Sequence, residues 1–227
     1  MITKIIQKKE PLTIIIPTAG TNRRMKKGPK ALLEVGGEKL ILRQIKTLKK
    51  TFPNAEFIVV TGYGADLIYP LLPSYVRCVE NEFYETTNVS RSIALGLRAA
   101  TTEQILIVYG DLVFSRMSFS LPSSSSLFYI SGNPKSDIAL NLEEDKVVHL
   151  SYISELKWAQ VIFLTGKELE LFRKSCYSRE NNVMFGHEIL NMVLQLGGTF
   201  KALQTHSVFE LDTISDFSRL KLSEIKL

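Results

Sequence analysis

A buried strand that runs directly into a small-residue loop constrains this chain more than any other feature. Residues 12–16 form an apolar, β-branched run whose length suits a strand buried on both faces of a sheet. The loop that follows carries Gly20, and four Lys and Arg side chains gather at residues 23–27. Backbone N–H groups in such a loop can point at phosphate oxygens while the cations neutralise the phosphate charge. The stretch therefore predicts a phosphate-binding site at the end of a buried strand.

The residues of this stretch differ in what they predict. Lys26 and Lys27 taken alone are typical of a surface turn with solvated charges. Gly20, Arg24 and Lys30 taken together favour a phosphate site, since Pro29-Lys30 closes the loop and leads back into apolar sequence.

Length and composition indicate one domain, spanning 1–227, that handles anionic ligands. A chain of 227 residues can bury one substantial core, and its 28 Lys and Arg against 23 Asp and Glu give a net charge of +5. No basic stripe with interleaved aromatic residues is present, so we expect no nucleic-acid partner. No apolar run approaches the length of a membrane span, and the first ten residues lack the apolar region of a signal peptide.

The two cysteines agree with a cytoplasmic location. Cys78 and Cys176 lie far apart without metal-ligand spacing, so we expect reduced thiols in a reducing compartment. The sequence predicts a cytoplasmic protein that does not insert into membranes, and it leaves a homodimer open.

The order of strand and helix patterns predicts the architecture. In the first half, strands are expected at 12–16, 55–61, 76–79 and 104–109, and helices at 40–52, 65–72 and from Asn88 onward. This alternation predicts a parallel sheet with right-handed crossovers. In the second half, shorter strands are expected at 127–131, 137–142, 146–152, 158–164 and 199–204, with helices at 167–176, 183–196 and 214–225. The cluster of short strands is typical of a β-meander, so the sheet is predicted to become mixed.

Acidic side chains follow two of the predicted strands. Asp111 follows the strand at 104–109, and ligands bind at the carboxyl ends of strands in open α/β sheets. Asp in an arbitrary sequence more often caps a helix or fills a turn, but the phosphate loop favours a metal ligand here. Glu210 and Asp212 point to one side of an extended segment, although Asp212 also suits the cap of the last helix.

Two further segments carry polar residues of uncertain role. Asn88 is a favoured N-cap residue for the helix that follows it. His187 and Glu188 are adjacent and therefore do not face the same way on a helix, so a helix-surface position is expected for both, with Glu188 able to reach an acceptor group.

The loop motif resembles that of the nucleotidyltransferases with a glycosyltransferase-A-like α/β fold. This superfamily includes sugar-phosphate nucleotidylyltransferases, phosphocholine cytidylyltransferases and the molybdopterin guanylyltransferase-like group. Its loop reads roughly Ala-Ala-Gly-x-Gly-x-Arg-Met followed by Pro-Lys-x-Leu, and residues 18–25 and 29–32 match it. Asn22 stands where the second glycine belongs, and Asn enters left-handed backbone conformations at low cost.

The resemblance implies a fold and an activity. The fold is α/β, with three α/β/α layers and a mostly parallel, mixed central sheet of the Rossmann-like, nucleotide-diphospho-sugar transferase type. Residues 12–113 would form a nucleotide-binding half and residues 126–213 an acceptor-binding half. The activity is Mg²⁺-dependent transfer of a nucleoside monophosphate from a nucleoside triphosphate to a small phosphorylated acceptor, with release of pyrophosphate. Such a reaction needs no protein nucleophile.

The resemblance also implies roles for individual residues. Lys30, Arg24 and Asp111 would be catalytic, and Asp111, Asp212 and Glu210 would hold Mg²⁺. The nucleotide would be bound by Thr18, Ala19, Gly20, Thr21, Asn22, Arg24, Lys30, Asn88, Ser92 and Gly110. Asp111-Leu112-Val113 is not the Asp-x-Asp of many related glycosyltransferases, which counts against glycosyl transfer.

The identity of the substrates is less constrained. Residues 81–97 resemble the Tyr-x-x-Thr-Asn-x-x-x-Ser-Leu segment of phosphocholine-type cytidylyltransferases, which favours CTP and a phosphocholine-like or phosphonate acceptor. One alternative is a sugar-1-phosphate nucleotidylyltransferase that makes a nucleoside diphosphate sugar. Another is a degenerate homologue that binds nucleotide without turnover. Asn22 in place of the second loop glycine would be the sign of that loss. The Lys30, Asp111 and Asp212 side chains argue against that second alternative.

Overall fold

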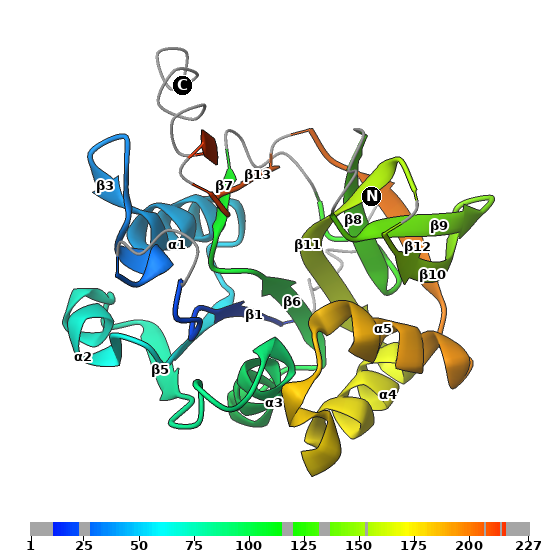
Figure 1. Cartoon of the computed structure of the whole chain (residues 1–227), viewed down its shortest axis with the longest axis horizontal. Coiled ribbons are helices and arrows are strands. Elements are labelled where there is room, and N and C mark those ends of the chain that lie inside the picture. The colour runs from blue at the N-terminus through cyan, green and yellow to red at the C-terminus, as the bar shows by residue number, and fades with distance from the viewer. Residues whose placement is uncertain are drawn as a thin grey trace, which may run out of the picture.

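A single mixed sheet organises the part of the chain that the computed structural model describes, which is residues 11–22, 28–114, 120–131, 137–152, 154–206, 208–213 and 215–216. The sheet has nine strands in the order β5-β4-β1-β6-β11-β8-β12-β10-β9 (Figure 1). Its strands are β1 (Leu12–Pro17), β4 (Glu56–Thr61), β5 (Val76–Glu80), β6 (Gln104–Val108), β8 (Ser126–Ser131), β9 (Ala139–Glu143), β10 (Lys146–Ser151), β11 (Leu156–Thr165) and β12 (Phe200–Gln204).

The first half of the sheet is parallel, as predicted. Strand β1 pairs in parallel with both β4 and β6, and β4 pairs in parallel with β5. Every residue of β1 is buried, which agrees with its continuous apolar sequence. The loop at residues 18–22, which is predicted to bind phosphate, therefore follows a central strand of the sheet.

Helices lie on both sides of this parallel half. The helices are α1 (Leu40–Thr51), α2 (Ala65–Ile68), α3 (Val89–Ala99), α4 (Gly166–Tyr177) and α5 (Gly186–Gln195). Figure 1 shows α1 on one side of β1 and β6, with α3 and α4 on the other. Apolar side chains of α1, such as Ile41 and Ile45, join the core that the strands form. The three-layer α/β/α prediction is thus confirmed.

The second half differs from the predicted meander. Strands β9 and β10 form an antiparallel hairpin with Glu144 in its turn at φ 57°. Strand β8 instead pairs with β11 and β12, and β12 separates it from β10. The helix predicted from residue 183 begins at Gly186, because residues 179–183 form a 3₁₀ helix.

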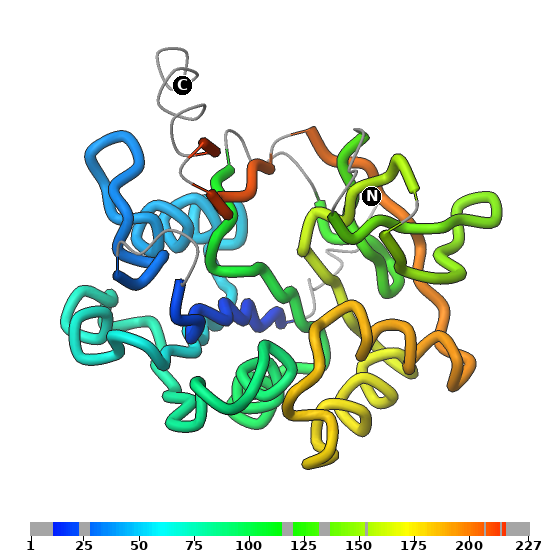
Figure 2. The backbone as a smooth tube through the Cα atoms, viewed as in Figure 1, coloured from blue at the N-terminus to red at the C-terminus, as the bar shows by residue number. Residues whose placement is uncertain are grey.

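A two-stranded ribbon that the sequence did not predict brings the C-terminal part of the described chain to the first half. Strand β7 (Leu112–Phe114) pairs antiparallel with β13 (Val208–Glu210), and Leu112 lies opposite Glu210. Figure 2 shows these segments side by side although almost 100 residues separate them in sequence. The N–H of Leu211 also donates to the carbonyl of Asp111 at 2.9 Å. This pairing carries Glu210 and Asp212 to Asp111.

Short elements complete the described chain. A hairpin of β2 (Glu34–Val35) and β3 (Glu38–Lys39) encloses the Gly36-Gly37 turn, and a 3₁₀ helix spans Lys30–Leu32. Cys78 and Cys176 are both free thiols. Every helix among the described residues is too short or too polar to cross a bilayer. The helix predicted at 214–225 and the loop cation Arg24 lie outside the described residues, apart from the two helical positions 215 and 216.

Candidate active site

A cavity of about 870 Å³ lies at the carboxyl ends of β1 and β6, between the two halves of the sheet. This is the crevice where open α/β sheets bind ligands. The described residues that the sequence predicted for the site all line it: Thr18, Ala19, Gly20, Thr21, Asn22, Lys30, Asn88, Ser92, Gly110, Asp111, Glu210 and Asp212. The structure therefore brings these predicted residues together.

The loop after β1 is held by hydrogen bonds at both ends. The N–H of Thr18 donates to the carbonyl of Val60 at 2.8 Å. Asn22 has a positive φ of 51°, as expected for the position of a family glycine, and its Nδ2 donates to the carbonyl of Gly28 at 2.7 Å. This bond joins the two sides of residues 23–27. Its Oδ1 is buried and has no hydrogen-bond partner among the residues that the structure describes.

Gly110 lets the β6 end approach this loop closely. Its N–H donates to the carbonyl of Pro17 at 3.1 Å, and a Cβ at this position would lie within 3 Å of Thr18 and of that carbonyl. Only glycine fits this approach, so the backbone that carries Asp111 is fixed against the loop.

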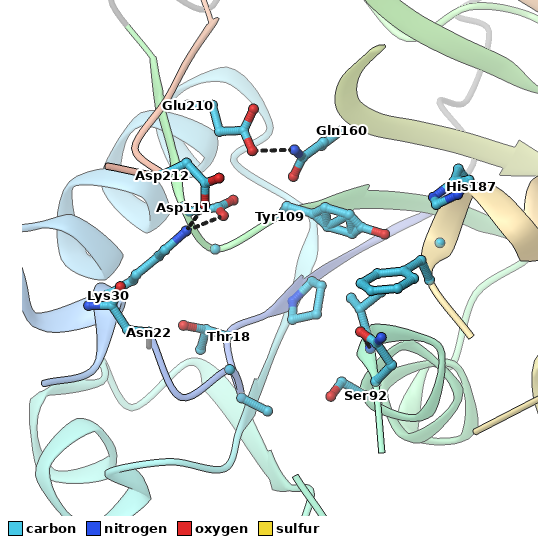
Figure 3. A pocket seen from close by; sticks show the side chains of 18 of the residues that line it. Thr18, Asn22, Lys30, Ser92, Tyr109, Asp111, Gln160, His187, Glu210 and Asp212 are labelled. Carbon is cyan, nitrogen blue, oxygen red and sulfur yellow. Dashed lines mark hydrogen bonds and ion pairs between the residues drawn. The ribbon is translucent and has the colours of Figure 1, made fainter. Parts of the chain in front are cut away.

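Lys30 and two carboxylates form the charged centre of the cavity (Figure 3). The Nζ of Lys30 donates to Asp111 at 3.1 Å and to Asp212 at 2.7 Å. Burial by itself would lower the pKa of Lys30, but the two carboxylates outweigh burial and raise the pKa above its usual value. Lys30 is therefore a fixed positive charge at the floor of the cavity.

The acidic side chains form a set that suits a divalent cation. Asp111, Glu210 and Asp212 each offer an oxygen within 4.8 Å of the others. Within the described part of the chain, the Oδ1 of Asp111 is buried without a hydrogen-bond partner, so one lone-pair site within the set is unused there. Carboxylate oxygens are the ligands that hard divalent cations prefer, and these residues could hold such an ion.

A second lysine, which the sequence analysis missed, borders this set. Lys157 on β11 pairs with Asp137 at 2.8 Å and with Glu210 at 2.9 Å. Gln160 donates to the other oxygen of Glu210 at 2.5 Å and has a positive φ of 56° within an irregular part of β11. Burial and the charge of Asp111 raise the pKa of Glu210. The one signal in the sequence was a lysine directly before the strand predicted at 158–164.

The N-terminus of α3 forms the opposite wall. The Oδ1 of Asn88 accepts from the N–H of Val89 at 2.8 Å, so Asn88 is the N-cap that its residue type predicted. Ser92 is buried and accepts from Asn81 at 3.1 Å. Both polar residues line the cavity, and Asn88 also caps the helix.

The first turn of α5 places His187 and Glu188 differently. His187 lines the cavity, where its ring stacks on Phe185 and meets Tyr152 edge to face, at centroid distances of 5.8 and 6.0 Å. Burial lowers the pKa of His187. Glu188 instead accepts from the N–H of Phe185 at 2.6 Å and caps the helix. Adjacent residues on a helix diverge, so one reaches the cavity and the other does not.

The loop after β1, Lys30 and the carboxylate set thus meet in the crevice of an open α/β sheet, as the resemblance to the nucleotidyltransferases implies. Residues 14–120 match the family model of the MobA-like NTP transferase domain. The resemblance predicted from the loop motif is therefore confirmed.

Solved structures of the same fold cover nearly the whole chain. The CTP:phosphocholine cytidylyltransferase of Streptococcus pneumoniae is 21% identical with a TM-score of 0.80, covering 94% of this chain and 98% of that one. The inositol-1-phosphate CTP transferase of T. maritima is 19% identical with a TM-score of 0.77, covering 94% and 96%. These likenesses confirm the fold.

One curated relative matches part of the chain. The bifunctional protein GlmU of Pseudomonas savastanoi pv. phaseolicola is 31% identical over 103 residues, which are 44% of this chain. The match spans only 22% of that relative, so it covers about a fifth of its length.

Proposed function

We propose that this protein transfers a nucleoside monophosphate from a nucleoside triphosphate to the phosphate of a small acceptor. An acceptor oxygen would form a new bond to the α-phosphorus, and the bond from that phosphorus to the bridging oxygen of the β-phosphate would break, releasing pyrophosphate. The observation that carries the proposal is the Lys30 ammonium between Asp111 and Asp212, at the floor of a cavity that the phosphate loop also lines.

Each wall of the cavity would have one task. Backbone N–H groups of residues 19–22, with Arg24, would hold the β- and γ-phosphates. Lys30 would neutralise the charge that builds up around the α-phosphorus, and fixed charges of this kind lower the barrier because they need no reorganisation. Asn88, Ser92 and Gly110 would approach the base and the ribose. Together, these contacts would hold the two reactants in line for the transfer.

A Mg²⁺ ion is part of the proposal. Asp111 and Asp212 would hold it, with Glu210 as a further ligand, and the unused Oδ1 of Asp111 supports this assignment. When bound, Mg²⁺ supplies a positive charge that offsets the phosphate charge and orients the triphosphate. The ammonium of Lys30 would offset the charge of the carboxylates around the ion.

The substrates follow from weaker signals. CTP and a phosphocholine-like or phosphonate acceptor are the first proposal, supported by the segment around Asn88 and by the cytidylyltransferases of like fold. A sugar 1-phosphate is the second candidate, supported by a glucose-1-phosphate thymidylyltransferase of like fold from Bacillus anthracis, 14% identical with a TM-score of 0.77. The division into a nucleotide-binding half (12–113) and an acceptor-binding half (126–213) belongs to the same proposal, as does a cytoplasmic location.

Pyrophosphate release tests the proposal directly. Purified protein with MgCl₂ would be incubated with each of four NTPs and a panel of phosphorylated acceptors, and the product mass would be measured. Pyrophosphate and a new nucleotidyl ester are expected in at least one combination, with CTP the best donor. NTP binding without turnover in every combination would instead support the degenerate homologue.

A further inference from the structure

Gln44 is a polar residue on the buried face of α1. It is 1% exposed, and the other buried residues of the helix are Leu40, Ile41, Ile45 and Leu48. A leucine would fit the apolar pattern of that face, and a buried amide is costly unless it is hydrogen-bonded. Gln44 does not line the cavity, so it does not meet a ligand there. An amide at this position therefore indicates a task that an apolar side chain could not perform.

The amide of Gln44 holds both ends of the turn that carries Asp111. Its Nε2 donates to the carbonyl of Tyr109 at 2.7 Å and to the carbonyl of Leu112 at 3.0 Å. The N–H of Leu112 donates to the same Tyr109 carbonyl at 3.3 Å and closes the four-residue turn. Both hydrogens of the amide are therefore used on this turn. Its Oε1 is buried without a partner among the described residues, so the contribution of the amide lies in these two donated bonds.

Apolar contacts also join α1 to this region. Leu40 of α1 packs with Val113 of β7 and with Leu211, which follows β13, in a small buried cluster. Figure 1 shows α1 beside the ribbon that these strands form. Apolar contacts are not directional, so they hold the ribbon against α1 without fixing the orientation of the turn. The two hydrogen bonds of Gln44 supply that direction, because hydrogen bonds weaken steeply when they are misaligned.

The orientation of the turn matters because both carboxylate oxygens of Asp111 have a task. Its Oδ2 accepts from Lys30 at 3.1 Å, and its Oδ1 is the buried oxygen that could bind a cation. The carboxylate must also keep an oxygen within 4.8 Å of Glu210 and Asp212. A rotation of the turn would move all of these distances together.

We propose that Gln44 is a positioning residue of the active site, which orients the Asp111 carboxylate toward Lys30 and the cation through the backbone of the turn. The inference rests on the proposed function, because it concerns a carboxylate that would hold Mg²⁺ there. Removing a polar group that orients a metal ligand commonly lowers metal affinity by about 10- to 100-fold. Gln44 acts through the backbone of the turn and not on the carboxylate itself, so we expect a loss near the lower end of that range.

Gln44→Met and Gln44→Glu test this role. Methionine has a similar length and volume but donates no hydrogen bond. Glutamate offers at most one donor, and its charged form would face two carbonyl oxygens, so it should disturb the turn more than methionine does. The turn keeps its backbone bonds to Pro17 and Leu211 in both variants, so the chain should still fold, and thermal unfolding would verify this.

Asn191→Leu is the matched control. Asn191 of α5 also holds a backbone segment by two hydrogen bonds: its Oδ1 accepts from the N–H of Leu150 at 2.8 Å, and its Nδ2 donates to the carbonyl of Leu150 at 2.9 Å. Neither residue lines the cavity. The control therefore loses the same kind of contact at a distance from Asp111.

Two measurements follow Asp111 without relying on turnover. Binding of Mn²⁺ alone would be measured from its EPR signal, and crystal structures of the Gln44 variants would give the position of the Asp111 carboxylate. Mn²⁺ affinity should fall about tenfold in Gln44→Met and further in Gln44→Glu, and it should stay within about twofold of wild type in Asn191→Leu. In the crystals, the Asp111 carboxylate should move by about 1 Å, a displacement large enough to impair catalysis.

The results separate this role from the proposed function. An Asp111 carboxylate that keeps its place in Gln44→Met would overturn the role. So would Mn²⁺ affinity equal to that of a wild type that binds the ion, or equal losses in Gln44→Met and Asn191→Leu. A displaced Asp111 together with a wild type that binds no Mn²⁺ would uphold the role and overturn the metal assignment. All the expected changes without pyrophosphate release from any pair of substrates would uphold the role and overturn nucleotidyl transfer.

Discussion

Asn22 offers the sharpest test of the loop, because its backbone and its side chain have separate effects there. Its φ of 51° requires a residue that tolerates the left-handed region. Its Nδ2 donates to Gly28 at 2.7 Å and so joins the two sides of residues 23–27. Replacement by glycine removes the side chain with its hydrogen bond and leaves the backbone unstrained, whereas replacement by valine removes the same bond and adds backbone strain.

The expected magnitudes differ for the two variants. A hydrogen bond of this kind contributes about 0.5–1.5 kcal/mol, and left-handed strain for a β-branched residue costs about 1–3 kcal/mol. Asn22→Val should therefore lose about 1.5–4.5 kcal/mol of unfolding free energy. Asn22→Gly also removes the buried, unpaired Oδ1, which offsets the lost bond, so it should stay within about 1 kcal/mol of wild type.

Asn22→Gly should lower nucleotide affinity although it changes stability little. Without the bond to Gly28 the loop must be ordered when the nucleotide binds. Asn22→Gly should therefore bind an NTP roughly 2- to 12-fold more weakly, which is the lost hydrogen bond expressed as an affinity ratio. Thermal or urea unfolding gives the first quantity, and titration calorimetry with MgCl₂ and CTP gives the second.

Glu144 supplies a matched control. It is exposed in the β9–β10 turn with a φ of 57°, and it does not line the cavity. Glu144→Val should show the backbone strain alone and leave NTP affinity unchanged. An Asn22→Val variant equal to wild type in both measurements would refute the alignment of residues 20–22 with the family loop. An Asn22→Gly variant with wild-type NTP affinity would refute the structural role of the side chain.

Three further predictions concern charge. Asp111→Asn should lower kcat by at least about 100-fold, the scale of losing one electrostatic stabiliser, and chelation of divalent cations should do the same to wild type; full activity in either experiment would contradict the metal assignment. Lys30→Ala should lower kcat strongly while Lys46→Ala, at a side chain 77% exposed, should not, and equal losses would mean a general basic surface instead of a site. Burial alone would raise the pKa of Glu56, but hydrogen bonds from two threonines and the charge of Arg77 outweigh it and lower the pKa below 4.5. A carboxyl with a lowered folded-state pKa stabilises the fold above pH 4.5 and loses that contribution as the pH falls further, so Glu56→Gln should flatten the fall of Tm with pH below 4.5; an unchanged slope would contradict this account.

The sequence by itself determined the parallel half of the fold and the loop at its centre. The strand at residues 12–17 is recognisable because burial on both faces demands a continuous apolar run. The helix cap at Asn88 and the left-handed backbone at Asn22 are local properties, since each depends on one residue type and its immediate neighbours. Such features need no knowledge of the rest of the chain.

Only the tertiary structure decided how distant segments meet. The ribbon of β7 and β13 places Glu210 and Asp212 beside Asp111, and short strands like these carry almost no periodic signal in sequence. The order of the strands after residue 126 likewise depends on which strand edges pair. The alternation of apolar and polar residues along one strand does not determine that pairing.

Two aromatic side chains that line the cavity also could not be singled out from the sequence. Tyr109 and Trp158 are expected core residues of predicted strands, and nothing in their spacing distinguishes them from other buried aromatic side chains. Both side chains pack against Gly186 in the first turn of α5, and such contact is a property of the tertiary structure. The loop signature that predicts phosphate binding is local and can be recognised in the sequence, whereas this wall of the cavity forms only when three separate segments pack together.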